Sequence, residues 1–462
     1  MNIQIKNLGV LKQTEFSLGD MTIICGENNT GKTYTTYALF GFLSFWQETF
    51  YVPVKDKYIN QLLADGVVHI GLLEYIQDAE HILSEACKTY AKQLPKVFAA
   101  SADLFKTADF QVALNSEDIR LRDQYEGRIG SAKAELFSIT KDEGSKELVV
   151  TLLVEKDEIS IPKKFIVQII GSALKDVIFS NHIPNPFIAS AERTGAAIFR
   201  KELNFNRNRI LKKIAQEDKN INPRDFLLKE YQDYALPVEK NVDFTRRLET
   251  IAKQSSFIAE KHSDVLSDFA DIIGGKYTVT PEDELYYEPK GKRIKLTMSE
   301  SSSAVRSLLD IGFYLRHVAQ PGDLLMVDEP ELNLHPENQR RMARLFARLV
   351  NLGIKVFTTT HSDYIIKELN TLIMLNHDKP YLKRIAENEG YNPEELISSD
   401  QIKVYIAEKE LVKLDGGSRR SRVHTLTLAD IDPELGIEAR SFDKTINKMN
   451  RIQEEIVWGE DE

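Results

Sequence analysis

The chain has 462 residues, 42% of them apolar, and its 60 Lys and Arg against 70 Asp and Glu give a net charge of −10. This length supports a large buried core in two or three domains, or in one domain with big insertions. The acidic balance argues against a surface that attracts nucleic acid as a whole, and two cysteines, Cys25 and Cys87, are too few for a disulfide framework or a structural zinc site.

No apolar run reaches the roughly 18 residues that a membrane-spanning helix needs. The opening "MNIQIKNLGV" has neither the charged start nor the apolar stretch of a signal peptide. We therefore expect a cytoplasmic protein without a membrane partner.

The N-terminal segment predicts two short strands in "NIQIKNLGVLKQTEFSL", a buried strand in "MTIIC" and a helix that starts near Lys32. Between the last strand and the helix, "GENNTGKT" fits the phosphate-loop pattern G-x-x-x-x-G-K-[ST] in full. In such a loop, backbone amides and the helix N-terminus hold phosphates, the lysine reaches the β and γ oxygens, and the hydroxyl binds Mg²⁺. The candidate nucleotide-binding residues are Gly26, Glu27, Asn28, Asn29, Thr30, Gly31, Lys32 and Thr33, with Thr33 as a metal ligand.

The middle of the chain predicts helices over 57–106, strands over 109–171, one strand at "PFIAS" and helices again over 199–273. One stripe in the second helical region has the alternating steps of four and three that are typical of a heptad pattern. Its members are Phe244, Leu248, Ile251, Ser255, Ile258, His262, Val265, Phe269 and Ile272. A continuous helix over this stripe would be about 43 Å long. The stripe therefore predicts a short helical hairpin.

From residue 275 on, strands and helices alternate. The strands "KYTVT", "ELYYEP" and "RIKLTM" precede the helix "SSAVRSLLDIGFYLRHV", and then come the strand "LLMV", the helix "ENQRRMARLFARLVNL" closed by Gly353, and the strand "KVFTTT". This alternation predicts an α/β fold with a parallel sheet covered by helices.

Two further candidate residue groups follow strands. Asp328 and Glu329 come at the end of "LLMV", where the first carboxylate can hold Mg²⁺ through water and the second can deprotonate an attacking water. A plain turn and helix start is the structural alternative. His361 ends "KVFTTT", so we expect it on the same sheet edge as Lys32 and Asp328, within reach of a γ-phosphate.

The spacing of these motifs separates classes of phosphate-loop proteins. Asp328 follows Lys32 by 296 residues (328 − 32), more than a GTPase or a small-molecule kinase needs, so a large insertion is expected. Basic clusters lie at 199–213, 340–348 and 418–422, and solvated faces are their commoner explanation.

The segments "GENNTGKT", "SESSSAVRSLL", "LLMVDEPELNLHP" and "TTTHSDY", in this order, resemble the ABC-class ATPase heads of the RecF, SMC and OLD group. The chain looks closest to compact bacterial members that serve as ATPase subunits in anti-phage defence systems such as Septu and PARIS. The resemblance covers about 1–45, 185–200 and 275–375, and the tail "DIDPELGIEARSFDKTINKMNRIQEEI" is also similar to the tails of those compact proteins.

The resemblance implies an ABC-type P-loop head with a mixed sheet and a helical-hairpin insertion. The expected parts are the N-terminal head (1–50), a mixed α/β insertion (51–184), a head strand (185–198), a helical insertion with a short coiled coil (199–274), the C-terminal head (275–380) and an α/β extension (381–462).

In that family, ATP lies between two heads, and the resemblance carries roles onto single residues. Ser302, with Ser303 beside it, would contact the γ-phosphate of the other head, Asp328 and Thr33 would hold Mg²⁺, Glu329 would be the catalytic base and His361 the switch histidine. Asn333 and His335 would lie at the dimer interface, and "ASAERTG" would place Ser190, Glu192 and Arg193 near the nucleotide. Gln47 is the weak candidate for a missing Q-loop glutamine.

The signature segment departs from the family pattern. Ala304 stands where a glycine is usual and Val305 where Gln or Glu is usual, so close approach of this backbone to a phosphate is in doubt. Slow hydrolysis and a lasting ATP sandwich are both left open.

The leading hypothesis is an ATPase, using ATP and Mg²⁺, whose head dimer or larger even-numbered homo-oligomer scaffolds and controls a partner effector, a nuclease or toxin. It rests on a complete ATP site and on the lack of any acidic nuclease cluster, Cys/His metal spacing or nucleophile elbow in the sequence. The alternative is a DNA-binding repair or maintenance ATPase, favoured by the basic clusters. An ABC transporter subunit fits less well, because the Leu-Ser-Gly-Gly-Gln signature is absent.

Overall fold

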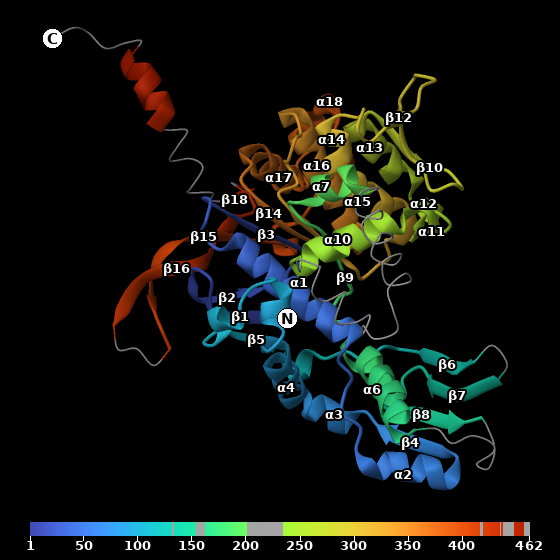
Figure 1. Cartoon of the computed structure of the whole chain (residues 1–462). Coiled ribbons are helices and arrows are strands. Elements are labelled where there is room, and N and C mark those ends of the chain that lie inside the picture. Colours follow the sequence, from blue (N-terminus) through green and yellow to red (C-terminus); the bar gives the residue numbers. More distant parts are fainter. Residues whose placement is uncertain are drawn as a thin grey trace, which may run out of the picture. The chain divides into compact units, whose positions relative to one another are not determined.

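The computed structural model describes residues 1–131, 134–153, 162–200, 234–415, 419–434, 436–437 and 448–456 (Figure 1). The chain forms two compact units, one made of 1–4, 41–93 and 109–185 and the other of 5–40, 94–108 and 186–462. We call them the insertion unit and the head unit. Among the described residues, no helix combines the length and apolarity needed to span a membrane.

A nine-stranded mixed sheet is the largest sheet among the described residues, in the order β5-β1-β2-β16-β15-β3-β14-β13-β9. Its strands are β5 (Asp109–Ala113), β1 (Asn2–Leu8), β2 (Leu11–Ser17), β16 (Arg420–Leu428), β15 (Ile402–Lys413), β3 (Met21–Gly26), β14 (Lys355–Thr360), β13 (Leu324–Asp328) and β9 (Pro186–Ala189). From β9 to β15 neighbouring strands run parallel, whereas β15 and β16 are antiparallel. The expected α/β class with a mixed sheet is confirmed, and strands lie where they were expected over 2–18, 21–25, 186–190, 324–327 and 355–360, with ends that differ by one residue at several of them.

The register of the parallel strands aligns their carboxyl ends. Asp328 pairs with Thr359, and Thr360 pairs with Cys25, the residue before the phosphate loop. On the other side of β3, Gly26 pairs with Ala407, and β15 continues to Lys413 beyond this pair. One edge of the sheet therefore carries the phosphate loop, the Asp-Glu-Pro turn and the Thr-Thr-Thr-His segment.

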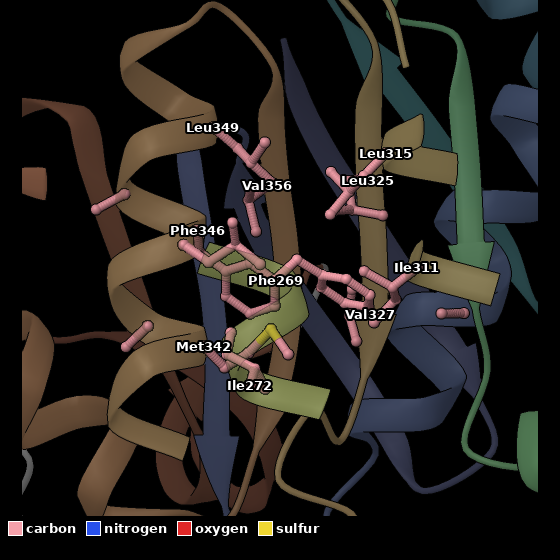
Figure 2. Close-up of a cluster of buried hydrophobic side chains, with 14 of the residues drawn as sticks. Phe269, Ile272, Ile311, Leu315, Leu325, Val327, Met342, Phe346, Leu349 and Val356 are labelled. Carbon is pink, nitrogen blue, oxygen red and sulfur yellow. The ribbon is translucent and has the colours of Figure 1, made fainter. Parts of the chain in front are cut away.

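Helices of the head unit bury the face of β13 and β14. The helical elements that lie in this unit, or begin in it, are α1 (Lys32–Glu48), α5 (Leu94–Val97), η1 (Ala102–Phe105), α7 (Arg193–Ile198), α10 (Leu236–Arg246), α11 (Leu248–Ile251), α12 (Phe257–Lys261), α13 (Ser263–Ile273), α14 (Ser303–Ser307), α15 (Leu309–Phe313), the π-helical turn η3 (Tyr314–Val318), α16 (Pro336–Asn351), α17 (Asp363–Leu375), α18 (Pro380–Glu389), η4 (Pro393–Glu395) and η5 (Ser399–Gln401). Figure 2 shows side chains of α13, α15 and α16 meeting those of β13 and β14.

Helix α16 illustrates why these residues form this layer. His335 caps its start by accepting from the Glu337 backbone N–H at 3.3 Å, and Pro336 occupies the first turn, where its missing N–H costs nothing. Met342, Phe346 and Leu349 then recur at helical spacing on the buried face. Gly353, at φ +83°, ends the segment.

The stripe over 244–272 does not form one long helix. It is divided among α10, α11, α12 and α13, with breaks at Arg247, at 252–256 and at His262. Ser256 starts α12 by capping the Ala259 backbone N–H at 3.0 Å, which favours a helix start over a continuing turn. The apolar members of the stripe are buried in the core of the head unit. The continuous heptad helix expected over this stripe is therefore wrong, because steps of three and four also mark any helix face that packs on a sheet. Residues 201–233 of the expected helical insertion lie outside the described residues, so the hairpin itself stays a prediction.

The insertion unit has its own antiparallel sheet in the order β4-β8-β7-β6. Its elements are α2 (Asp56–Asp65), β4 (Val67–Gly71), α3 (Leu73–Gln77), α4 (Ala79–Ala91), η2 (Ser116–Asp118), β6 (Tyr125–Ser131), β7 (Ala134–Lys141), β8 (Glu147–Leu152) and α6 (Lys163–Phe179). Two expectations fail here. β4 interrupts the helices expected over 57–106, because Gly66 in left-handed geometry ends α2 just before a β-branched run. Residues expected as a strand near 165–171 belong to α6, which begins after Pro162.

Residues 381–462, expected as an extension beyond the head, supply two strands of the central sheet, β15 and β16. Two smaller sheets complete the head unit. They are β10 (Gly275–Val279) with β11 (Leu285–Pro289) and β12 (Leu296–Thr297), and β17 (Ile431–Asp432) with β18 (Gly436–Ile437).

Candidate functional site

The phosphate loop requires glycine at both ends. Gly26 and Gly31 have φ of +136° and +109°, where L side chains are strained. A Cβ at Gly26 would lie 2.5 Å from the Ala407 carbonyl oxygen, and one at Gly31 would lie 2.7 Å from the Leu11 side chain. The loop is therefore shaped as a backbone cradle that a side chain at either position would disturb.

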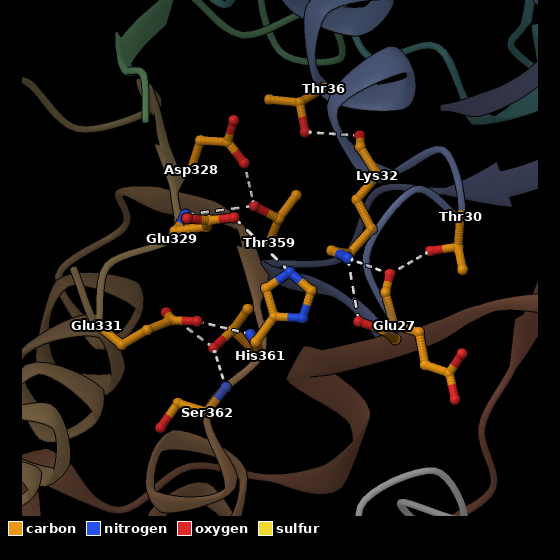
Figure 3. Close-up of polar contacts among 12 residues, drawn as sticks. Glu27, Thr30, Lys32, Thr36, Asp328, Glu329, Glu331, Thr359, His361 and Ser362 are labelled. Carbon is orange, nitrogen blue, oxygen red and sulfur yellow. Dashed lines mark hydrogen bonds and ion pairs between the residues drawn. The ribbon is translucent and has the colours of Figure 1, made fainter. Parts of the chain in front are cut away.

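Lys32 is folded back onto this cradle. Its side chain is buried, and its ammonium donates to the carbonyl oxygens of Gly26 at 3.0 Å and Glu27 at 2.7 Å (Figure 3). Burial lowers the pKa of Lys32, and the carboxylates of Glu329 and Asp328 act in the opposite direction. Thr30 donates to the same Glu27 carbonyl at 2.8 Å. The Lys32 ammonium therefore lies beside the loop and donates to carbonyl oxygens that phosphate oxygens can replace.

A cavity of about 640 Å³ opens at this loop. It is lined by Val10, Asn28, Asn29, Gly31, Lys32, Thr33, Tyr34, Glu329 and His361. Its volume is in the range of small-ligand sites, and Thr33 is exposed at its wall.

Asp328 is the last residue of β13 and is only 2% exposed. One carboxylate oxygen accepts from the Thr359 hydroxyl, and the other is buried without a hydrogen-bond partner among the described residues. Burial raises the pKa of Asp328 to about 6, against the lowering effect of the Thr359 hydrogen bond. A buried oxygen with no partner is a site where a water of a hydrated cation would fit.

The side chains of Glu329 and His361 lie next to each other at the cavity wall. The Glu329 carboxylate Oε1 lies 3.6 Å from His361 Nε2, and burial, followed by the charge of Lys32, lowers the pKa of His361. Glu329 has φ +50°, in the left-handed region, and its backbone N–H donates to the Thr359 carbonyl at 3.1 Å. The backbone therefore turns the Glu329 carboxylate toward the cavity at a cost in strain.

Glu331 also belongs to this site, although no sequence pattern pointed to it. Its carboxylate accepts from the His361 backbone N–H at 2.6 Å and from the Thr360 hydroxyl at 2.9 Å (Figure 3). Burial raises the pKa of Glu331. These two hydrogen bonds fix the histidine segment to the turn after β13.

Arg193 was expected near the nucleotide, but it does not line the cavity. It is 1% exposed, and its guanidinium donates to four carbonyl oxygens, those of Ser307 at 2.7 Å, Ser190 at 2.7 Å, Asp328 at 2.6 Å and Glu329 at 2.8 Å. Direct contact with a ligand is therefore excluded in this conformation. The arginine instead joins the end of β13 to the end of α14.

Asp310 lies in the same buried region. It is 1% exposed, and neither carboxylate oxygen has a hydrogen-bond partner among the described residues. Burial raises the pKa of Asp310 to about 7, with Arg193 acting in the opposite direction.

Ser190 and Glu192 also belong to this corner. Ser190 is fully buried, with its N–H bonded to the Asn241 side chain at 2.9 Å, whereas the exposed Glu192 accepts from the Tyr37 hydroxyl at 2.9 Å. Tyr37 is part of α1, so Glu192 lies beside the helix that follows the phosphate loop.

The signature segment stands apart from the cavity. Ser302 is exposed and caps α14 through the Val305 backbone N–H at 3.3 Å, and neither Ser302 nor Ser303 lines the cavity. Val305 is buried in the core, which explains an apolar residue there, while Ala304 is half-buried.

Two residues expected at a dimer interface are exposed. Asn333 has φ +62°, and His335 caps α16 as described above. The turn that carries them is tied to α14, because the Ser307 hydroxyl donates to the Leu332 carbonyl at 3.1 Å.

Gln47 is not brought to the phosphate loop. It is in the last turn of α1, about 22 Å from Lys32 by the helical rise per residue. Its side-chain amide donates to the carbonyls of Ile183 and Pro184 at 3.3 and 3.4 Å. The proposed Q-loop role of Gln47 is therefore wrong.

A family model described as "AAA ATPase domain" matches residues 1–366. The SMC head domain from Thermotoga maritima is 10% identical over 93% of this chain and 98% of that chain, with a TM-score of 0.29. The Smc head domain with an extended coiled coil from Pyrococcus furiosus, bound to the C-terminal domain of ScpA, is 12% identical over 98% of each chain, with a TM-score of 0.30. No curated protein matches the chain.

Proposed function

The chain belongs to the AAA ATPase domain family. We therefore propose that it binds ATP with Mg²⁺ at the cavity beside Lys32 and hydrolyses the ATP there to ADP and phosphate. The observation that carries this proposal is the meeting of three separate segments at one sheet edge. The phosphate loop, Glu329 and His361 all line one cavity of about 640 Å³.

The chain's own residues fit a magnesium nucleotide. The glycine cradle accepts phosphates with its backbone amides, and Lys32 can exchange its two carbonyl partners for phosphate oxygens. Thr33 would bind Mg²⁺ directly and Asp328 through water, using its unpartnered buried oxygen. The cation, when bound, supplies charge neutralisation at the phosphates.

Glu329 and His361 divide the remaining work. Glu329 lies at the cavity wall and would accept the proton of the attacking water. His361, whose lowered pKa keeps it neutral near pH 7, would donate a hydrogen bond toward the γ-phosphate or the water. Glu331 positions His361 through its backbone.

We also propose that two heads close on the nucleotide. Ser302 is exposed at the start of α14 and does not line the cavity of its own head, so its hydroxyl is available to a second copy. Asn333 and His335 are exposed on the turn that follows the candidate base. We propose that this ATP-dependent association controls a partner effector protein, since no group of three or more metal-ligating side chains occurs among the described residues to serve as a second catalytic centre.

The test uses Glu329→Gln, which keeps the size of the side chain and removes the base. We expect ATP binding within about threefold of wild type, hydrolysis reduced at least a hundredfold, and an ATP-dependent dimer by size exclusion with light scattering. Wild-type hydrolysis by Glu329→Gln would contradict the assignment of the base. A monomer at saturating ATP would contradict head closure while leaving the ATP site intact.

The effector proposal needs its own experiment. The wild-type chain, Glu329→Gln and Lys32→Ala would be co-expressed with the products of neighbouring genes. A partner whose nuclease or toxin activity differs between the ATP-trapped and the nucleotide-free variant would support control. A chain that acts on DNA alone, with no such partner, would favour the repair alternative, which one surface described below also supports.

A further inference from the structure

The hairpin β15–β16 extends past the end of the phosphate-loop strand. Its outer pairs are Lys409 with His424, Leu411 with Arg422, and Lys413 with Arg420. Paired residues of antiparallel strands lie on the same face, and the face alternates along each strand. All six of these side chains therefore share one face of the ribbon, which we call the basic face.

Charge is separated between the two faces. Lys409, Lys413, Arg420 and Arg422 are exposed on the basic face, with Leu411 54% exposed between them. The acidic residues of β15, Glu408 and Glu410, pair with Thr425 and Val423 on the opposite face. One face of the ribbon therefore carries the cations and the other carries the carboxylates of β15.

The nearest acidic group beyond the strand is already neutralised. Asp415, which follows β15, forms an ion pair with Lys6 at 2.6 Å and accepts from the Gln13 side chain at 3.0 Å. Among the described residues, no ion pair is found for the four cations of the basic face. Their charge is free to meet an external anion.

The other basic clusters of the sequence differ. In 340–348, Arg340 and Arg344 bind Glu368 at 2.6 Å, and Arg348 binds Asp264, Asp268 and Glu394. The cluster at 199–213 lies almost wholly outside the described residues. Of the three clusters, only the one that begins at 418 shows free cations in the described structure.

We propose that the basic face of the β15–β16 ribbon is a binding site for the phosphate backbone of duplex DNA. The three pairs span about 13 Å along the strand, beside which a duplex presents roughly eight phosphates. A two-stranded ribbon fits the B-form major groove, about 12 Å wide, whereas the major groove of A-form RNA is too narrow for side chains to read. Leu411 would then contact the groove wall between the cations.

This site does not depend on nucleotide or on head closure. Four phosphate contacts predict a salt slope of about −3.6, so affinity for DNA would fall about 150-fold between 50 and 200 mM salt. The four cations are assigned to phosphates, which carry no sequence information, so sequence preference is expected to be weak.

The experiment is fluorescence anisotropy of a labelled DNA duplex with the full chain, without ATP. The double variant Arg420→Glu/Arg422→Glu should lose at least tenfold in affinity and have a flatter salt slope. The matched control is Lys292→Glu/Arg293→Glu, which makes the same change of charge at two exposed residues between β11 and β12. Thermal unfolding of each variant shows whether it is folded.

Three results would overturn the site. The first is that the ribbon variant binds DNA as tightly as wild type. The second is that the control variant loses as much affinity for DNA as the ribbon variant. The third is that polyglutamate or duplex RNA displaces the labelled duplex as well as unlabelled DNA does. The last result would indicate a general polyanion or acidic-protein surface. Failure of ATP hydrolysis in other assays would not affect this test, because nucleotide is absent from it.

Discussion

Replacing Arg193 tests whether the buried guanidinium positions the candidate base. The arginine donates to the carbonyls of Asp328 and Glu329 on one side and of Ser307 on the other. Arg193→Met leaves four buried carbonyl oxygens without this donor, and we expect a loss of about 3 to 5 kcal/mol in the free energy of unfolding. Arg193→Lys keeps the charge but supplies one donor group, and we expect roughly half of that loss.

The expected effect on catalysis is separate from the effect on stability. Glu329 stands at φ +50°, and its carbonyl is fixed by Arg193. Release of this peptide would move the Glu329 carboxylate on the order of 1 Å, which can cost about a hundredfold in rate. Because of this displacement of the Glu329 carboxylate, we expect kcat for ATP hydrolysis by Arg193→Lys to fall about 10- to 100-fold. The KM for ATP should change less than about threefold.

Arg200 provides the matched control. It is also buried, at 4% exposure, and donates to the Thr245 carbonyl at 2.7 Å and to Asp283, away from the cavity. Arg200→Lys should lower the melting temperature without lowering kcat per folded molecule. If both lysine variants reduce kcat in proportion to the folded fraction, Arg193 has only a structural role. A change in KM alone for Arg193→Lys would refute the positioning argument as well.

Lys32→Ala should weaken ATP binding at least a hundredfold, measured with a fluorescent ATP analogue, whereas Lys12→Ala, at an exposed position of β2, should bind as wild type. Glu331→Gln replaces a carboxylate that accepts two hydrogen bonds, so kcat should fall about tenfold, while Glu337→Gln on the exposed start of α16 should not change it. Asp310 has a folded pKa of about 7, above its unfolded value, so its ionisation destabilises the fold as pH rises from about 4 to 7. We therefore expect the difference in melting temperature, Asp310→Asn minus wild type, to increase from pH 5 to pH 8. A difference that does not change with pH would contradict this expectation.

The sequence predicted the parts of the site that depend on local signals. The phosphate loop needs two glycines, a lysine and a hydroxyl within eight positions, and Asp328 and His361 follow apolar strands directly. Parallel strands end at one edge, so the meeting of these residues followed from the fold class. Glu331 was missed because a carboxylate in a turn has no periodicity or spacing that distinguishes it from a solvated one.

Long-range pairing was harder to predict. β15 lies next to β3 although Ala407 is far from Gly26 in sequence, and no local pattern specifies which parallel strand is a neighbour. The stripe from Phe244 to Ile272 shows the reverse problem, because its pattern was real but its partner was misjudged. A stripe of buried residues indicates that a face is covered and leaves open whether a sheet or a second helix covers it.

The geometry around Arg193 connects two halves of the proposed ATP sandwich within one head. In the proposed sandwich, Glu329 would act on the nucleotide held by its own head, whereas Ser302, at the start of α14, would contact the nucleotide of the other head. Arg193 binds the Glu329 carbonyl and the carbonyl of Ser307 at the end of α14. If engagement of a partner's nucleotide by Ser302 shifts α14, we expect the Glu329 peptide to move with it, because Arg193 donates to both carbonyls. Hydrolysis at one site would then depend on occupancy of the other, and ATP hydrolysis by wild type should have a Hill coefficient above 1 that Arg193→Lys lowers toward 1.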